Sequence, residues 1–315
     1  MLALIFDKSL KLHDVSIPKR KNGESLIRVK LAGICNTDIE IVKGYMNFKG
    51  ILGHEFTGIV EESDNKELTG KRVVGEINIS CENCRFCYSG LERHCNNRQT
   101  LGIFNKDGVF AEFITLPDNN LHVLPEIVSD REAVFVEPLA AALEILEQVH
   151  IEPFSEIAVI GDGKLGSLIA QVLKINGNDV TVYGTDAKKL DLIMSFGIKT
   201  QKNDHSVNEK YDIVVECSGN PEGFFDAVQM TNPRGTIVLK STFHEKLELN
   251  IAPLIINEIS LIGSRCGRFE PAIRHLENKH IKIEPLISEV FPLKDAIEAF
   301  QFAKNREVLK VLIEV

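Results

Sequence analysis

The stretch from Ile157 to Leu173, IAVIGDGKLGSLIAQVL, constrains the fold more than any other part of the chain. An apolar run, three glycines and an amphipathic run follow one another, which predicts a strand, a tight turn and a helix. The glycines fit G-x-G-x-x-G: one for the sharp turn, one that lets a pyrophosphate approach the backbone, and one for close strand–helix packing. Free N–H groups and the helix dipole favour phosphate there. The residues expected to contact a nucleotide cofactor at this turn are Gly161, Gly163, Lys164, Leu165 and Gly166.

Length and charge narrow the class of protein. A chain of 315 residues is longer than the chains that usually fold around a single hydrophobic core, so we expect two domains. A formal net charge of −9 lacks the basic footprint of a nucleic-acid binder. No apolar run approaches the roughly 18 residues of a membrane span. The N-terminal segment carries Asp7 and Lys8, which favours a first strand over a signal peptide. We expect a cytoplasmic protein with neither nucleic-acid nor membrane partners.

Four of the seven cysteines lie within the segment CENCRFCYSGLERHC. Such clustering favours metal ligands in a reducing compartment over a disulfide framework or four unrelated thiols. Three cysteines at x-x spacing and a fourth shortly afterwards can surround one zinc ion as a tetrahedral site that is closed to substrate. An iron–sulfur cluster is the competing metal interpretation. The four residues are Cys81, Cys84, Cys87 and Cys95.

A second group of metal-ligand residue types lies upstream, in a region of short alternating runs that predicts β-structure with tight turns. Cys35 and the pair His54-Glu55 are each ordinary alone, because single cysteines and histidines are usually structural. Together with Thr37 and Asp38, they form a candidate metal site. Thiolate, imidazole and carboxylate together suit zinc, and a catalytic zinc keeps one position open for water or a substrate oxygen.

The order GICNTD, GHE, C-x-x-C-x-x-C-x₇-C and G-x-G-x-x-G resembles the zinc-dependent medium-chain dehydrogenase/reductase superfamily, the alcohol and polyol dehydrogenases. The resemblance covers nearly the whole chain. It implies an α/β protein with a GroES-like β-rich catalytic domain and a Rossmann domain built on a doubly wound parallel sheet. The implied boundaries are 1–138, with a structural zinc lobe at 81–95 and completion by 280–315, and 139–279 for the NAD(P)-binding domain. Two zinc ions per chain are implied, one catalytic and one structural.

The resemblance also assigns metal ligands. Cys35 and His54 match the ligands of the catalytic zinc, and Glu55 matches a carboxylate that ligates directly or through exchange. The third ligand in the polyol and sugar branch is a glutamate before Pro-Leu, and this chain has Glu137 in VEPLAAAL. The plainer alternative is that Glu137 caps a helix beginning at Pro138.

Two further residues receive roles from the resemblance. Thr37 matches the hydroxyl that relays a proton from the substrate alcohol, and Asp38 resembles a partner that orients a ligand. Together with Glu55 they are the residues expected to act in catalysis. The chain departs from the family pattern at Glu40, where a histidine is common, and in the shortened segment Glu61–Leu68. The loops that shape the substrate pocket are therefore expected to differ from those of longer family members, and so is the substrate class.

The choice of cofactor depends on the end of the second strand, VTVYGTDAKKL. NAD enzymes usually have an acid there that bonds the ribose 2′-hydroxyl. This chain has Gly184 or Thr185 at that position, and Asp186 follows one or two places later. Because Lys188 and Lys189 lie nearby, the sequence slightly favours NADP, although both lysines also suit a solvated helix surface.

From Glu132 onward the pattern is helical and then alternates between strands and helices. A helix over Glu132–Val149 is expected to link the domains, and short apolar runs between helix-length segments predict a parallel doubly wound sheet. By resemblance, Ser218 contacts the adenosine side of the cofactor, Lys240 to Phe243 adjoin the nicotinamide, and Arg265 reaches a phosphate. The predicted strands are Ile157–Ile160, Asp179–Tyr183, Tyr211–Glu216, Gly235–Leu239 and Ile259–Ile262.

The resemblance implies reversible hydride transfer between an alcohol and its ketone or aldehyde, with a polyol, sugar or amino alcohol favoured by Glu137. It also implies a homodimer or homotetramer paired through the strand near Ser260–Gly263. Two alternatives stay open. A zinc-free quinone or enoyl reductase of the same superfamily normally lacks the cysteine lobe. A non-enzymatic zinc-lobed binding module would be expected to carry a basic stripe, whereas this lobe mixes arginines with Glu82 and Glu92.

Overall fold

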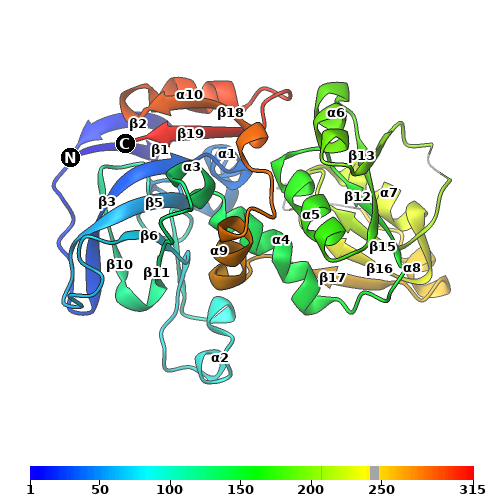
Figure 1. The fold of residues 1–315 in the computed structure, drawn as a ribbon, viewed down its shortest axis with the longest axis horizontal. Coiled ribbons are helices and arrows are strands. Elements are labelled where there is room, and N and C mark those ends of the chain that lie inside the picture. Colours follow the sequence, from blue (N-terminus) through cyan, green and yellow to red (C-terminus); the bar gives the residue numbers. More distant parts are fainter. Residues whose placement is uncertain (207, 242–247) are drawn as a thin grey trace. The chain divides into compact units, whose positions relative to one another are not determined.

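The computed structural model describes residues 1–206, 208–241 and 248–315. The chain divides into two compact units: unit 1 comprises 1–137, 272–278 and 286–315, and unit 2 comprises 138–271 and 279–285. Helices α4 (Val136–Gln148) and α9 (Phe269–Glu277) each belong partly to both units. Both chain termini lie in unit 1 (Figure 1). This division places Pro138, 272–278 and 280–285 differently from the boundaries expected by resemblance.

A seven-stranded mixed sheet forms the main part of unit 1. Its strands are β3 (Glu24–Gly33), β5 (Glu55–Glu62), β6 (Arg72–Gly75), β10 (Phe113–Pro117), β11 (Leu121–Val123), β18 (Ile287–Pro292) and β19 (Lys310–Glu314). The order across the sheet is β11-β6-β5-β3-β19-β18, and β10 also pairs with β3. All pairs are antiparallel except β18 with β19. The register pairs Gly33 with Glu55, at the sheet end where the candidate metal group begins.

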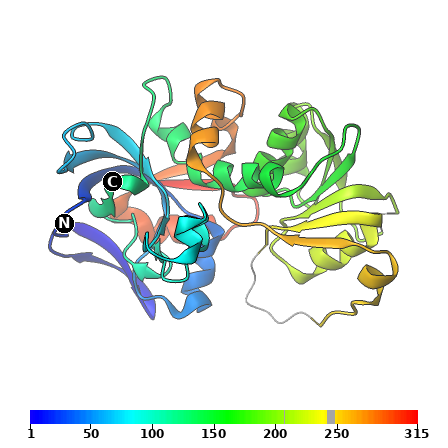
Figure 2. The same ribbon diagram turned by 90° about the horizontal axis from the view of Figure 1, so that it is seen from below.

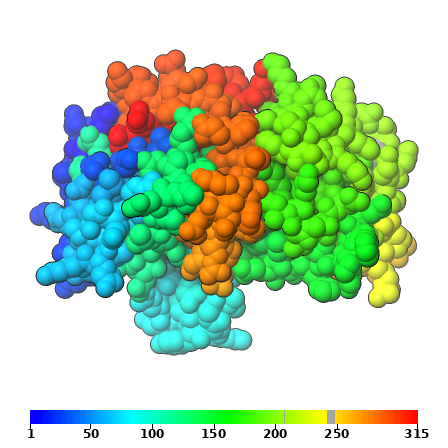
Figure 3. Space-filling view, in the orientation of Figure 1, coloured from blue at the N-terminus to red at the C-terminus, as the bar shows by residue number. Residues whose placement is uncertain are grey.

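Two three-stranded sheets and several short helices complete unit 1. The strands are β1 (Leu2–Asp7), β2 (Ser9–Asp14) and β4 (Gly50–Ile51) in one sheet, and β7 (Asn78–Ile79), β8 (Gln99–Leu101) and β9 (Asn105–Lys106) in the other. The helices are α1 (Asn36–Val42), α2 (Arg85–Tyr88), α3 (Asp130–Ala133) and α10 (Ala296–Ala303). The lobe at 81–95, which contains α2, stands out from the rest of unit 1 (Figures 1 and 3).

The core of unit 1 follows from the alternation along its strands. In β3 the apolar side chains of Ile27, Val29 and Leu31 are buried, whereas Arg28 between them is exposed. A period of two places alternate side chains on one face of a sheet. Phe110 and Phe300 meet edge to face with ring centroids 5.5 Å apart, and both are fully buried. The apolar face of the sheet therefore packs into a core that holds the strand ends in place.

Unit 2 contains a six-stranded, all-parallel sheet. Its elements are β12 (Glu156–Ile160), α5 (Lys164–Ile175), β13 (Asp179–Gly184), α6 (Ala187–Ser195), β14 (Lys199–Lys202), β15 (Tyr211–Glu216), α7 (Pro221–Met230), β16 (Thr231–Leu239), α8 (Ala252–Ile256) and β17 (Ser260–Gly263). The order is β14-β13-β12-β15-β16-β17, and helices cover both faces (Figure 2). The order reverses at β12, and ligands of such sheets bind at the carboxyl end of that strand.

The expected doubly wound parallel sheet is confirmed, with three local differences. Strand β16 begins at Thr231, four residues before the predicted Gly235. The sheet has a sixth strand, β14, which the sequence did not predict. The expected helix Glu132–Val149 is broken into α3 and α4, because Ser129 starts α3 with a capping box and the chain then turns at Val134-Phe135 to bury both side chains. No helix among the described residues combines the length and apolar character needed to cross a bilayer.

Candidate active site and cofactor site

Three potential metal ligands converge in unit 1. Cys35 precedes α1, His54 directly precedes β5, and Glu55 is the first residue of β5. One ligand atom from each residue lies within 4.8 Å of the others. A tetrahedral zinc ion with bonds of about 2.0–2.3 Å needs ligand atoms of these types at this order of separation. His54 and Glu55 are almost fully buried, so the group fits a zinc ion held in the protein interior.

Asp38 connects the two segments that carry these ligands. Its carboxylate accepts hydrogen bonds from the backbone N–H of Cys35 at 2.8 Å and of Gly53 at 3.2 Å. The same carboxylate lies 3.4 Å from Nδ1 of His54. Asp38 is fully buried, on the third position of α1. This is the arrangement of a residue that fixes the orientation of metal ligands.

The electrostatics of the group favour a cation. Burial by itself lowers the pKa of His54, but the negative charge of Asp38 and of Cys35 outweighs burial and raises that pKa well above its usual value. Nδ1 of His54 is buried without a hydrogen bond among the described residues. A pocket that stabilises a positive charge on imidazole is also one in which a divalent cation is stabilised.

Glu55 has a partner that the sequence analysis missed. Its Oε2 forms an ion pair with Nζ of Lys310, the first residue of β19, and the two side chains are 1% and 0% exposed. The Lys310 Nζ also lies 5.5 Å from the ring centroid of Phe135. A Cβ atom at Gly33 would lie 2.6 Å from Glu55 Oε2, so the glycine makes room for the carboxylate. The negative charge beside the metal group is thus balanced from the C-terminal strand.

The predicted proton relay Thr37, the atypical Glu40 and the predicted ligand Glu137 lie on α1 and α4. Oγ1 of Thr37 lies 3.7 Å from the sulfur of Cys35. Glu40, three residues later on the same helix face, forms an ion pair with Lys43 at 2.8 Å. Glu137 is in the first turn of α4, which begins at Val136 rather than at Pro138. Glu137 is not among the three residues whose ligand atoms converge, so its role as a ligand stays a prediction.

The four lobe cysteines form a second group. Their sulfurs lie within 4.8 Å of one another, with neighbouring pairs at 3.4, 3.5 and 3.7 Å. Four thiolates about 2.3 Å from one zinc ion are separated by about this much, whereas a cluster of several irons spreads its cysteines further apart. The N–H of Cys87 holds the pKa of Cys84 down at about 6, which favours the thiolate that a metal requires. The geometry fits a single tetrahedral ion.

The glycine-rich turn joins β12 to α5 at the switch point of the sheet. Gly161 has φ +130°, and its N–H donates to the carbonyl of Tyr183 at 2.8 Å. A Cβ atom at Gly166 would lie 2.0 Å from the Gly161 carbonyl oxygen, whereas one at Gly163 would meet nothing within 4 Å. The first and third glycines are therefore required by the fold, and the space beside the second is open to a ligand. Lys164 and Leu165 form the start of α5.

A carboxylate that the sequence analysis also missed lies beside Gly184 at the end of β13. It belongs to Asp162, the middle residue of Gly161-Asp162-Gly163. Its Oδ2 accepts hydrogen bonds from the N–H groups of Thr185 at 2.7 Å and of Asp186 at 2.8 Å. The predicted cofactor residues Gly184 and Thr185 are thus in direct contact with the glycine-rich turn.

The other predicted cofactor residues lie at the carboxyl ends of later strands. Ser218 follows β15, and its N–H and hydroxyl donate to the buried Glu216 at 2.8 and 2.6 Å. Lys240, at the end of β16, donates to the carbonyls of Ala141 and Arg265 at 2.6 and 3.1 Å. Cys217, directly after β15, is half-buried, and desolvation raises the pKa of its thiol, which disfavours a reactive thiolate. Thr242 and Phe243, also predicted to adjoin the nicotinamide, lie outside the described residues.

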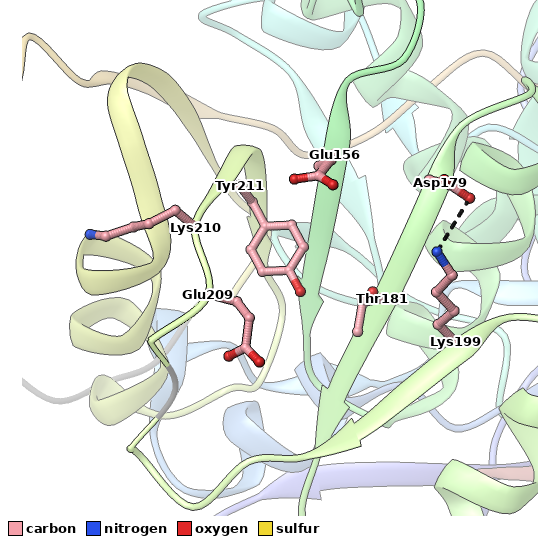
Figure 4. Close-up of a pocket in the computed structure, with 7 residues that line it drawn as sticks. All are labelled: Glu156, Asp179, Thr181, Lys199, Glu209, Lys210 and Tyr211. Atoms are coloured by element: carbon pink, nitrogen blue, oxygen red, sulfur yellow. Dashed lines mark ion pairs between the residues drawn. The ribbon is translucent and has the colours of Figure 1, made fainter.

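A cavity of about 390 Å³ lies at the opposite end of the unit 2 strands (Figure 4). Glu156 and Asp179 are the first residues of β12 and β13, and Asp179 pairs with Lys199 at 3.7 Å. Parallel sheets of this kind bind cofactors at the carboxyl ends, so this amino-end cavity is separate from the candidate cofactor site. Its other lining residues are Thr181, Glu209, Lys210 and Tyr211.

Fold and sites together define the class of protein. A doubly wound sheet with a glycine-rich turn at its switch point is typical of dinucleotide binding. A thiolate–imidazole–carboxylate group and an all-thiolate group in the same chain are typical of a zinc enzyme. The class defined by these features is a zinc-dependent oxidoreductase that uses a nicotinamide dinucleotide.

Comparison with known proteins agrees with this class. Residues 21–126 match the alcohol dehydrogenase GroES-like domain, and residues 165–278 match the zinc-binding dehydrogenase domain. A sorbitol dehydrogenase from Halalkalibacterium halodurans is 31% identical over 310 residues, which cover 91% of this chain and 90% of the relative. The fold matches an alcohol dehydrogenase from Escherichia coli CFT073 solved with NADH, at TM-score 0.92, 27% identity and coverage of 100% and 99%.

A candidate zinc-binding dehydrogenase from Sinorhizobium meliloti 1021, solved with NADP, matches at TM-score 0.90, 27% identity and the same coverage. The chain belongs to the zinc-containing medium-chain alcohol and polyol dehydrogenase family. This membership, together with the two groups of potential metal ligands, rules against the zinc-free reductase and the non-enzymatic binding module.

Proposed function

We propose that the chain interconverts a polyhydroxylated or amino alcohol with its ketone or aldehyde by reversible hydride transfer. The observation that carries the proposal is the convergence of Cys35, His54 and Glu55 in the interior of unit 1. Glu137, at the start of α4, supports the polyol and sugar branch as the third ligand. The name of the sorbitol dehydrogenase relative supports the same substrate class.

Zinc and nicotinamide supply the chemistry that side chains lack: the metal lowers the pKa of an alcohol, and the nicotinamide ring exchanges a hydride. Cys35 and His54 would hold the metal, with Glu137 as the third ligand and the carboxylate of Glu55 as a ligand that binds directly or by exchange. Asp38 keeps the two ligand-bearing segments in register through its contacts with Cys35 and Gly53. The hydroxyl of Thr37, beside the Cys35 sulfur, would take the proton that leaves the substrate alcohol.

Unit 2 would hold the dinucleotide. The open space beside Gly163, the N-cap residue of α5, supports pyrophosphate binding at the start of that helix. Ser218 and Arg265 are proposed contacts further along the sheet. The lack of an acid at Gly184 and Thr185 supports NADP, whereas the carboxylate of Asp162 supports NAD.

A homodimer or homotetramer is part of the proposal. Strand β17 is an edge of the unit 2 sheet, and an edge strand offers unpaired backbone groups to a second copy. Leu261 on β17 and Ile255 and Ile256 on α8 are apolar side chains exposed by 45%, 67% and 77%. None of the seven cysteines, all of which lie in the described residues, forms a disulfide, and this supports the expected cytoplasmic location.

Metal analysis of matched cysteine variants tests the proposal. Purified protein should contain two zinc ions per chain. Cys35→Ser should lose one zinc and all turnover while it retains dinucleotide binding. Cys84→Ser should lose the other zinc and destabilise the lobe at 81–95. Loss of neither zinc from Cys35→Ser, or full turnover by that variant, would refute the proposed active site.

A further inference from the structure

We propose that Asp162 makes the cofactor site select NAD(H) over NADP(H), because its carboxylate lies where the 2′-phosphate of NADP would bind. The inference rests on the proposed nicotinamide-dependent function and concerns only recognition of the adenosine ribose. Asp162 would thus supply, from the first turn of the dinucleotide fold, the acid that the end of β13 lacks.

The first observation concerns the backbone donors after β13. The N–H groups of Thr185 and Asp186 are adjacent and point toward one oxygen, Oδ2 of Asp162, at 2.7 and 2.8 Å. Successive backbone N–H groups of this kind form a site that binds an anion. Here the anion is an internal carboxylate. A 2′-phosphate would have to displace Asp162 to use the same two donors.

The second observation concerns the space beside Gly184. A Cβ atom at this position would lie 2.4 Å from Oδ2 and 2.5 Å from Cβ of Asp162. The side chain of Asp162 therefore fills the volume into which a side chain from the end of β13 would project. Glycine at 184 and aspartate at 162 form a matched pair, and together they place one carboxylate at the strand end.

The chemistry of the two cofactors then decides the preference. The ribose of NAD carries a 2′-hydroxyl that can donate a hydrogen bond to a carboxylate oxygen, as the acid at this site does in NAD-binding folds. Both hydrogen bonds that Asp162 accepts within the described residues go to Oδ2, which leaves Oδ1 for the ribose. A ribose phosphate carries roughly −1.5 to −2 charges at neutral pH and would be repelled at contact distance.

Helix α6 carries charges that oppose this preference. Lys188 and Lys189 are the basic residues that favour a phosphate. Asp186 adds a second carboxylate at the N-cap of α6, where it accepts from the N–H of Lys189 at 3.1 Å. Asp162 contacts the anion-binding N–H groups directly, so we infer that its charge outweighs the lysines.

Fluorescence titration of the zinc-loaded protein with NADH and with NADPH tests the inference. Wild-type protein should bind NADH at least about tenfold more tightly than NADPH. Asp162→Asn keeps a carbonyl acceptor for both N–H groups and removes only the charge, so it should narrow that ratio by about tenfold, chiefly through tighter NADPH binding. Asp162→Gly frees both donors and should narrow the ratio further.

Asp179→Asn is the matched control, because it removes an exposed carboxylate at the first residue of β13, far from Gly184 at its carboxyl end, and should leave the ratio unchanged. Wild-type protein that binds NADPH as tightly as NADH would overturn the inference and leave the proposed function intact. A ratio unaltered in both Asp162 variants would also overturn it. Binding of neither dinucleotide by wild-type protein would overturn the inference together with the proposed function.

Discussion

The negative charge of Glu55, in the candidate metal site, is balanced by a lysine from a distant part of the chain. Lys310 and Glu55 are 255 positions apart and meet in the interior of unit 1. The carboxylate beside the ligands was predictable from GHE, whereas its partner was not, because periodicity identifies β19 as a strand without naming its neighbour. The only signal was a lysine inside the apolar run VLKVLIEV. Asp162 was also missed. It occupies a variable position of the glycine-rich motif, and the sequence does not show that its side chain reaches the end of β13.

Removing Lys310 should destabilise unit 1. Lys310→Met leaves the carboxylate of Glu55 buried and unpaired, which typically costs about 3–5 kcal/mol of the free energy of unfolding. Urea unfolding followed by circular dichroism measures this loss. The double variant Glu55→Gln with Lys310→Met removes both charges and should recover much of it.

Lys49→Met is the control for the loss of a lysine. Its ion pair with Asp7 is 2.9 Å long, but the side chains are 64% and 62% exposed, so the unfolding midpoint should not move. An equal loss of stability in Lys49→Met and Lys310→Met would contradict the role assigned to the buried pair.

Elements were predicted well wherever the hydrophobic pattern was strong. Strands β12, β13 and β15 appear within one residue of their expected bounds, because each is a short buried apolar run. Strand β14 was missed because its sequence, KTQK, is polar and three of its four residues are exposed on the sheet edge. The split of the expected helix Glu132–Val149 was equally invisible, since the residues at the break are as apolar as a helix face.

The glycine-rich turn gives a prediction that separates folding from binding. Gly166→Ala would force a Cβ atom to 2.0 Å from the Gly161 carbonyl, so it should lower the thermal unfolding midpoint of unit 2. Gly163→Ala adds a methyl group to open space at φ −74°, so the midpoint should be retained while NADH affinity falls at least about tenfold. Differential scanning fluorimetry and NADH titration measure the two effects. Wild-type NADH affinity in Gly163→Ala would show that no pyrophosphate approaches the turn.

On the scale of the whole molecule, length and motif order predicted two domains and a parallel nucleotide-binding sheet. Which core the later segments join was harder to predict. Residues 272–278 belong to unit 1 and 279–285 to unit 2, although α9 runs across the first boundary. Local periodicity defines helices and strands, whereas membership of a core depends on contacts between residues far apart in the sequence.

The assembly state is predicted from the exposed edge of unit 2. Light scattering after size-exclusion chromatography should give two or four times the chain mass. Leu261→Glu places a charge on the edge strand β17 and should shift the protein toward monomer. Met194→Asp, at a side chain on α6 that is 55% exposed, should leave the mass unchanged. A wild-type monomer at working concentration would refute this prediction.

The central claim, that a zinc-bearing unit and a dinucleotide-binding unit together oxidise an alcohol, is tested most directly by chelation. Reduction of the nicotinamide is followed with sorbitol and a panel of other polyols, sugars and amino alcohols, before chelation, after it, and after zinc is restored. We predict turnover that disappears with the metal and returns with zinc, while dinucleotide binding persists throughout. Undiminished turnover by metal-free protein would contradict the account, as would no turnover of any alcohol by protein that holds both zinc ions and the dinucleotide.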